Sequence, residues 1–97
     1  MTKREKSSDP EIWCDFNGRM TERGFLPTSG TLRDLAALGL TLESAVGRRF
    51  VFVSGDEDEH GNPDDIMCNG IVVRDLAFGI LLEADESGIY WRSELQD

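Results

Sequence analysis

Four apolar segments in the second half of the chain are separated by turn-forming residues, and this pattern constrains the fold most. The segments cover residues 49–54, 66–74, 78–84 and 89–92. Short segments with turn residues between them at this spacing are typical of antiparallel strands in a small sheet. Asn69-Gly70 interrupts the second segment and indicates either a β-bulge or a tight turn. Residues 85–88 predict a tight hairpin loop between the last two strands.

One more strand is predicted near the start of the chain. Ile12, Cys14 and Phe16 alternate with more polar or outward-facing positions, which is the period of a strand with one buried face. Asn17-Gly18 is a preferred pair for a two-residue hairpin turn. Residues 19–21 are therefore the expected returning arm.

A short helix is predicted over residues 31–38. Thr31 is a suitable N-cap, with Asp34 at the third position beyond it, and Gly39 lies where a left-handed residue ends many helices. The apolar face of this helix would carry Leu32, Leu35 and Leu38. Residues 40–47 are compatible with a second helical turn or with a loop.

These segments predict an α+β fold that is mainly antiparallel β, namely a small SH3-like roll or partly open barrel of about five strands. Residues 1–9 lack apolar side chains beyond Met1, and we expect a disordered N-terminal tail there. Residues 10–97 would then form a single small β-rich domain. No run approaches the ~20 apolar residues of a membrane span, and the charged N-terminus is unlike a signal peptide. We therefore expect a cytoplasmic protein with no membrane partner.

The charge of the chain is distributed unevenly. The formal net charge is −9, and residues 51–97 alone carry two basic and twelve acidic side chains. Such a surface repels nucleic-acid phosphates, so no nucleic-acid partner is expected. A basic protein surface is its natural electrostatic complement.

Residues 54–66, SGDEDEHGNPDDI, hold six of these carboxylates. A solvated connection between strands explains the segment, since Asp, Asn, Gly and Pro supply turn chemistry. The alternative is a calcium site in the loop 56–65, because the spacing of Asp56, Asp58 and Gly61 resembles part of an EF-hand loop. His60 and Met67 do not fit the fifth and twelfth positions of that loop, and the flanks predict strands. A looser calcium site would use Asp56, Asp58, Asn62, Asp64 and Asp65.

Three aromatic residues, Trp13, Tyr90 and Trp91, are candidate partner contacts. Neighbouring side chains of a strand point to opposite faces, so one of Tyr90 and Trp91 is expected in the core and the other partly exposed. Outward aromatics would act as anchors for a partner beside the acidic loop. The residues of this loop that are predicted to contact the partner are Asp56, Glu57, Asp58 and Glu59. Packing of all three aromatics in the core or at its rim is the alternative.

Nothing in the sequence predicts an enzyme. Phosphate-binding glycine motifs are absent, and two cysteines with one histidine cannot assemble a structural zinc site. Cys14 and Cys68 are predicted to be small buried side chains, and His60 a surface residue. We predict a non-catalytic interaction or regulatory module without a cofactor, either a monomer or a weak homo-oligomer. A calcium-binding domain is the alternative.

Overall fold

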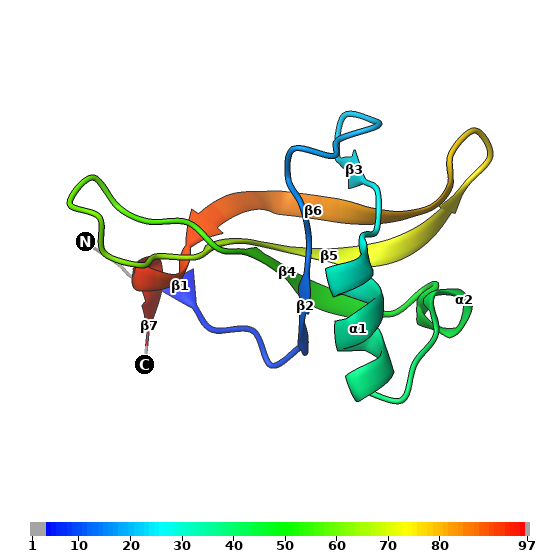
Figure 1. Ribbon diagram of the computed structural model, residues 1–97, viewed down its shortest axis with the longest axis horizontal. Coiled ribbons are helices and arrows are strands. Elements are labelled where there is room, and N and C mark those ends of the chain that lie inside the picture. The colour runs from blue at the N-terminus through cyan, green and yellow to red at the C-terminus, as the bar shows by residue number, and fades with distance from the viewer. Residues whose placement is uncertain (1–3, 97) are drawn as a thin grey trace.

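The computed structural model describes residues 4–96 and has the α+β architecture that the sequence predicts (Figure 1). Five strands form one open, mostly antiparallel sheet in the order β2-β4-β5-β6-β3. The strands are β2 (Glu11–Trp13), β3 (Gly24–Phe25), β4 (Arg49–Ser54), β5 (Ile66–Asp75) and β6 (Gly79–Trp91). β2 pairs with β4 in parallel and the other pairs are antiparallel. A separate parallel pair joins β1 (Arg4–Glu5) to β7 (Leu95–Gln96), near the two chain ends.

The second half of the chain follows the predicted strands with one correction. β4 has the predicted bounds and β5 extends one residue further. The hairpin predicted at residues 85–88 is wrong, because β6 is continuous from Gly79 to Trp91. Cys68 of β5 pairs with Ile89, whereas Gly70 pairs with Ala84, so residues 85–88 bulge out opposite Asn69. The extra residues of this irregularity lie on β6, and β5 runs through Asn69-Gly70 without a turn, so that pair lies opposite a bulge and does not reverse the chain.

The hairpin predicted at Asn17-Gly18 is also wrong. β2 pairs with β4 instead, and residues 15–18 form a turn in which the Gly18 amide donates to the Asp15 carbonyl at 3.0 Å. The amide of Asn17 donates to the Asp15 carboxylate at 2.9 Å. Within residues 4–96 no residue other than glycine has a positive φ, which the predicted hairpin turn would require of Asn17.

Two short helices follow. α1 (Ser29–Ala37) begins two residues before the predicted start, with Thr28 as its N-cap in place of Thr31. The Thr31 hydroxyl instead accepts the Thr28 amide at 3.1 Å from inside the first turn. Gly39 has φ +76°, which confirms its predicted left-handed conformation after the helix. α2 (Leu42–Ala45) is the second helical turn left open by the sequence, and a 3-10 turn, η1 (Arg92–Glu94), precedes β7.

The apolar face predicted for this helix is only partly correct. Leu35 is fully buried together with Thr31, whereas Leu32 and Leu38 are exposed. The helix packs along edge strand β2 (Figure 1), so only a narrow stripe of its surface faces the sheet. No helix within residues 4–96 combines the length and the apolar character needed to cross a membrane.

Apolar side chains gather on both faces of the sheet. The main cluster lies between the sheet and the helices and contains Ile12, Cys14, Phe25, Leu35, Ala45, Phe50, Phe52, Cys68, Val72 and Leu82. A second, smaller cluster contains Val51, Met67, Tyr90 and Leu95. Alternation along β4 sends Phe50 and Phe52 to the first cluster and Val51 to the second, so this central strand is covered on both faces.

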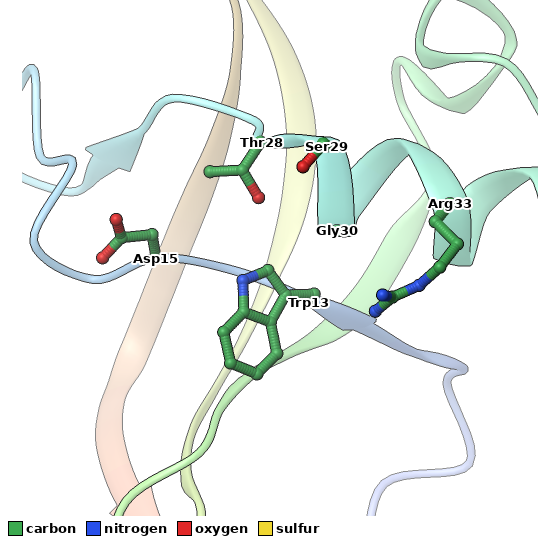
Figure 2. A pocket seen from close by; sticks show the side chains of 6 residues that line it. All are labelled: Trp13, Asp15, Thr28, Ser29, Gly30 and Arg33. Atoms are coloured by element: carbon green, nitrogen blue, oxygen red, sulfur yellow. The ribbon is translucent and has the colours of Figure 1, made fainter.

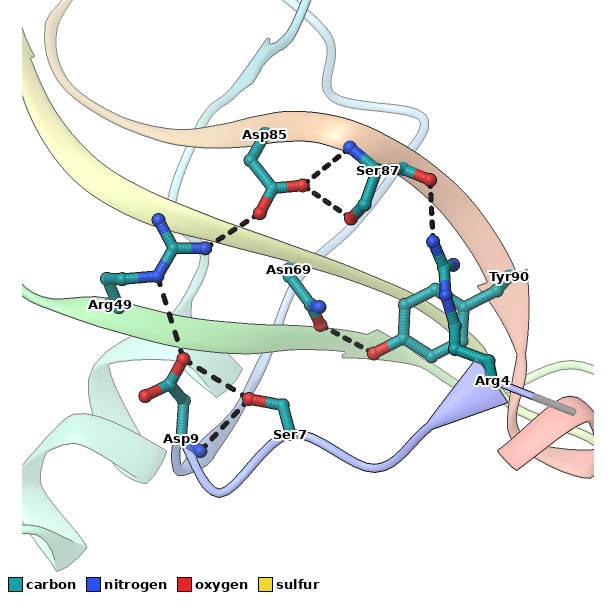
Figure 3. Close-up of polar contacts among 8 residues, drawn as sticks. All are labelled: Arg4, Ser7, Asp9, Arg49, Asn69, Asp85, Ser87 and Tyr90. Atoms are coloured by element: carbon teal, nitrogen blue, oxygen red, sulfur yellow. Dashed lines mark hydrogen bonds and ion pairs between the residues drawn. The ribbon is translucent and has the colours of Figure 1, made fainter. Parts of the chain in front are cut away.

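The second cluster is closed by the N-terminal residues (Figure 3). The Arg4 guanidinium lies 4.1 Å from the centre of the Tyr90 ring and donates to the Ser87 carbonyl at 2.8 Å. Arg49 contacts both Asp85, at 2.7 Å, and Asp9, at 3.7 Å. The disordered tail predicted over residues 1–9 stays a prediction, although Arg4, Ser7 and Asp9 within it make polar contacts. Residues 1–3 lie outside the described residues.

Candidate functional site

Residues 56–64 fold into a small hairpin of their own, here called the acidic hairpin. Glu57 and Pro63 form an antiparallel bridge, and the Asp64 amide donates to the Asp56 carbonyl at 2.9 Å. At the tip, the Asp58 carboxylate accepts the amides of His60 and Asn62 at 2.9 and 3.0 Å. The bond from Asn62 is the largest cause that holds the pKa of Asp58 below its ordinary value. The loop is thus a folded element whose tip is fixed by its own carboxylate.

The predicted calcium ligands are not brought together. The carboxylate of Asp58 faces the backbone of the hairpin tip, and that of Asp64 accepts the amide and hydroxyl of Ser93 at 3.0 and 2.6 Å. Asp65 pairs with Arg92 at 2.8 Å. Between residues 4 and 96 no group of three or more histidine, cysteine or acidic side chains is placed to hold a metal ion. The set Asp56, Asp58, Asn62, Asp64 and Asp65 therefore forms no cage in this structure.

Three carboxylates of the acidic hairpin point into solvent. Asp56, Glu57 and Glu59 are exposed, and no arginine or lysine among the described residues pairs with them. The neighbouring His60, which is also exposed, lies 3.5 Å from the Glu59 carboxylate. The outer side of the hairpin therefore presents negative charge that the described part of the chain leaves almost uncompensated.

Arg92 connects edge strand β2 to Asp65, the residue that directly follows the acidic hairpin. Its guanidinium contacts Glu11 at 2.7 Å and Asp65 at 2.8 Å, and its amide donates to the Asp65 carbonyl at 2.9 Å. The hydrogen bond from Arg92 is the largest cause that lowers the pKa of Glu11. One cation therefore orients the hairpin relative to β2.

Trp13, the last residue of β2, is held against the start of α1 (Figure 2). Its amide donates to the Asp34 carboxylate at 2.8 Å, and its carbonyl accepts the Thr31 hydroxyl at 2.7 Å. A Cβ on Gly30 would lie only 2.7 Å from the indole Cδ1, so the ring needs glycine there. The other end of the ring faces Gly55, where a Cβ would lie 3.9 Å from Cη2. Trp13 therefore lies between α1 and the residue that leads into the acidic hairpin.

Two hollows lie along the seam between α1 and β2, and a third lies beyond the end of α1; we call them together the α1–β2 furrow. The first, of about 660 Å³ (Figure 2), is lined by Trp13, Asp15, Thr28, Ser29, Gly30 and Arg33. The middle one, of about 330 Å³, is lined by Glu11, Ile12, Trp13, Asp34, Ala37, Leu38 and Val53. The third, of about 480 Å³, is lined by Asp9, Pro10, Leu38, Leu40, Arg48, Arg49 and Phe50. Trp13 lines both the first and the middle hollow, and Leu38 lines both the middle and the third.

The three predicted aromatic contacts do not form one surface. Tyr90 is buried in the second cluster and donates its hydroxyl to Asn69 at 2.6 Å, so it cannot serve as an exposed anchor. Trp91 is half-buried on β6, and strands β4 and β5 lie between it and Trp13. Trp13 is the more exposed of the two tryptophans and adjoins Gly55, which leads into the acidic hairpin. Leu38 was missed as a site residue because helical periodicity assigned it to the core.

The cysteines have the predicted buried positions. Cys14 and Cys68 are both buried and free. Burial raises the pKa of Cys68 to about 12 and moves that of Cys14 in the same direction. Because the thiolate is the nucleophilic form of cysteine, neither side chain is suited to nucleophilic attack near neutral pH.

Comparison with known proteins gives no family assignment. No protein-family model matches the chain, and no match is found among curated proteins or solved structures.

Proposed function

We propose that this protein is a non-catalytic interaction module that binds a basic surface of another protein through the acidic hairpin. The observation that carries the proposal is the exposure of Asp56, Glu57 and Glu59 without a basic partner. They are exposed on a folded hairpin and have no arginine or lysine partner among residues 4–96. Charges fixed on a folded element attract a partner of opposite sign without first having to order a loop.

Other features support a binding role. The two cysteines are buried and their pKa values are raised, whereas the single histidine, His60, lies exposed on the acidic hairpin, so no cysteine lies beside it to act as an activated nucleophile. A cytoplasmic location is part of the proposal, and two unpaired thiols suit a reducing compartment. The finer classification as an SH3-like roll is also part of the proposal, and it rests on the number and spacing of the strands. The module is proposed to act as a monomer or weak homo-oligomer.

A charge-matched pair of variants tests the proposal. The first variant carries Asp56→Asn, Glu57→Gln and Glu59→Gln. The second removes the same number of charges elsewhere, by Glu22→Gln, Glu83→Gln and Glu86→Gln. The probe is a synthetic decalysine peptide, and amide NMR titration at two salt concentrations gives its affinity and its contact residues.

We expect the hairpin variant to bind decalysine roughly tenfold more weakly, and the control variant to bind like the wild type. Binding should weaken as salt rises, because exposed charges are screened. Equal losses in both variants would mean that only net charge matters and would contradict the proposal. So would an absence of shifts at residues 56–64.

A further inference from the structure

The middle hollow of the α1–β2 furrow is lined by exposed apolar side chains on both sides. Trp13 is 36% exposed on the β2 side and Leu38 is 45% exposed at the end of α1. Ile12 is buried beneath them, and Val53 is half-buried. Large apolar side chains that remain exposed around a concave site are typical of protein contact surfaces. The volume of about 330 Å³ is at the lower end for ligand pockets, and it suits one side chain.

This hollow is also preformed. Both backbone polar groups of Trp13 are bound by α1 side chains, and the indole packs on Gly30. An aromatic side chain held in this way loses little conformational freedom when a partner binds. The site therefore needs no rearrangement to receive an apolar group.

The charge around the hollow favours a cationic occupant. Its two charged lining residues, Glu11 and Asp34, are both acidic, and each has an arginine partner, Arg92 for Glu11 and Arg33 for Asp34. Trp13 adjoins Gly55, which precedes the six carboxylates of residues 56–65. The arginines of the furrow lie in the other two hollows, where Arg33 faces the first and Arg48 and Arg49 line the third. The carboxylates nearby that have no arginine or lysine partner among residues 4–96 are Asp56, Glu57 and Glu59 of the acidic hairpin, so the attraction for a cation comes from that side of the hollow.

We propose that the middle hollow receives one apolar side chain from a partner segment that carries lysine or arginine beside it. This inference rests on the proposed function, because the basic residues of the same segment would contact the acidic hairpin. Trp13 and Leu38 provide the apolar contact and the hairpin provides the electrostatic one. The partner class is therefore a basic polypeptide with an apolar anchor, and a purely polycationic chain would use only half of the site.

Two synthetic nonapeptides test this inference. Both carry four lysines on each side of one central residue, which is leucine in the first peptide and serine in the second. Trp91→Phe leaves Trp13 as the only tryptophan, so its fluorescence reports on the middle hollow. The indole NH resonance of Trp13 in the wild-type protein gives the same information without any substitution.

The leucine peptide is expected to bind roughly tenfold more tightly than the serine peptide and to shift the emission of Trp13 to shorter wavelength. Leu38→Ala should remove this advantage. Leu76→Ala is the matched control, because Leu76 is fully exposed on the turn between β5 and β6, outside the furrow, and should leave both affinities unchanged.

The remaining outcomes separate the two proposals. Equal binding of both peptides with no change at Trp13 would overturn the docking hollow and leave the proposed function intact. Binding of neither peptide would overturn both. Trp13 emission that changes with protein concentration in the absence of peptide would assign the hollow to a second copy of the chain, which also overturns the inference.

Discussion

The two faces of the sheet are closed in different ways. On one face α1 and α2 cover a cluster that includes Phe52 and Leu82, both fully buried. On the other face the smaller cluster around Tyr90 and Leu95 is covered by the two ends of the chain, which Arg4, Arg49 and Arg92 hold by polar contacts. Burial of apolar area contributes more to stability than exposed ion pairs do. The helical face should therefore set the global stability, and the terminal face should open first.

The largest expected effect on the free energy of unfolding comes from replacing a leucine by alanine, and the comparison makes this substitution once on each face. Leu82→Ala removes a fully buried side chain from the main cluster and should lower the free energy of unfolding by about 3–5 kcal/mol. Leu95→Ala acts on the smaller cluster, whose cover can readjust, and should cost about 2 kcal/mol or less. Urea unfolding of both variants measures the difference. Equal losses would contradict the distinction between the faces.

A smaller effect is expected from Arg92→Ala. Arg92 contacts Glu11 and Asp65 while partly exposed, so its loss should cost about 1 kcal/mol. Hydrogen exchange should accelerate at the backbone of residues 4–5 and 92–96 and remain slow in β4. Arg74→Ala is the control, because its contact with Glu43 is more exposed and lies outside the terminal face. Faster exchange in β4 would show that the two faces open together.

The pH dependence of the terminal face gives a finer test. Arg92 lowers the pKa of Glu11 in the folded protein below its ordinary value of 4.5. A carboxyl with a lowered pKa stabilises the fold above its unfolded pKa, and this contribution is lost as the pH falls through the folded pKa. Glu11→Gln should therefore flatten the loss of stability below about pH 5. Thermal unfolding of wild type and variant between pH 3 and pH 7 checks this, and identical profiles would refute the role of Glu11.

Calcium should have the smallest effect. To bind the acidic hairpin it would have to draw Asp64 from Ser93 and Asp65 from Arg92, which would loosen the terminal face. We expect millimolar calcium to leave the unfolding midpoint unchanged relative to excess chelator, since an ion that does not bind the native state cannot stabilise it. A saturable rise in the midpoint, with NMR shifts at residues 56–65, would restore the calcium alternative.

The helical face was largely predictable from the sequence and the terminal face was not. Alternation at Ile12 and Cys14 and the apolar run of β4 mark the main cluster directly. The terminal face depends on Arg4 with Ser87 and on Arg92 with Glu11, pairs that are more than eighty residues apart. Local patterns carry no information about such polar pairings. Residues 85–88 were mistaken for a hairpin loop because bulges and turns use the same residue types.

The candidate site was predictable only in part. The acidic segment and the partial exposure of Trp13 follow from charge and from strand alternation. The exposure of Leu38 could not be predicted in this way, since helical spacing cannot show that α1 packs along an edge strand and leaves one flank uncovered. The internal bonds of Asp58, Asp64 and Asp65 were equally inaccessible, because a carboxylate-rich loop has the same composition whether it binds a metal or its own backbone.

The two hydrogen bonds between α1 side chains and the backbone of Trp13 also affect how copies of this protein meet. An outer strand with free amides and carbonyls is a template on which another chain can add, the first step toward fibrils. Asp34 and Thr31 occupy these groups at the β2 edge, so no foreign strand can extend the sheet there without first detaching the helix. Contacts at this point of the β2 edge are therefore expected to be made by side chains and not by an added strand.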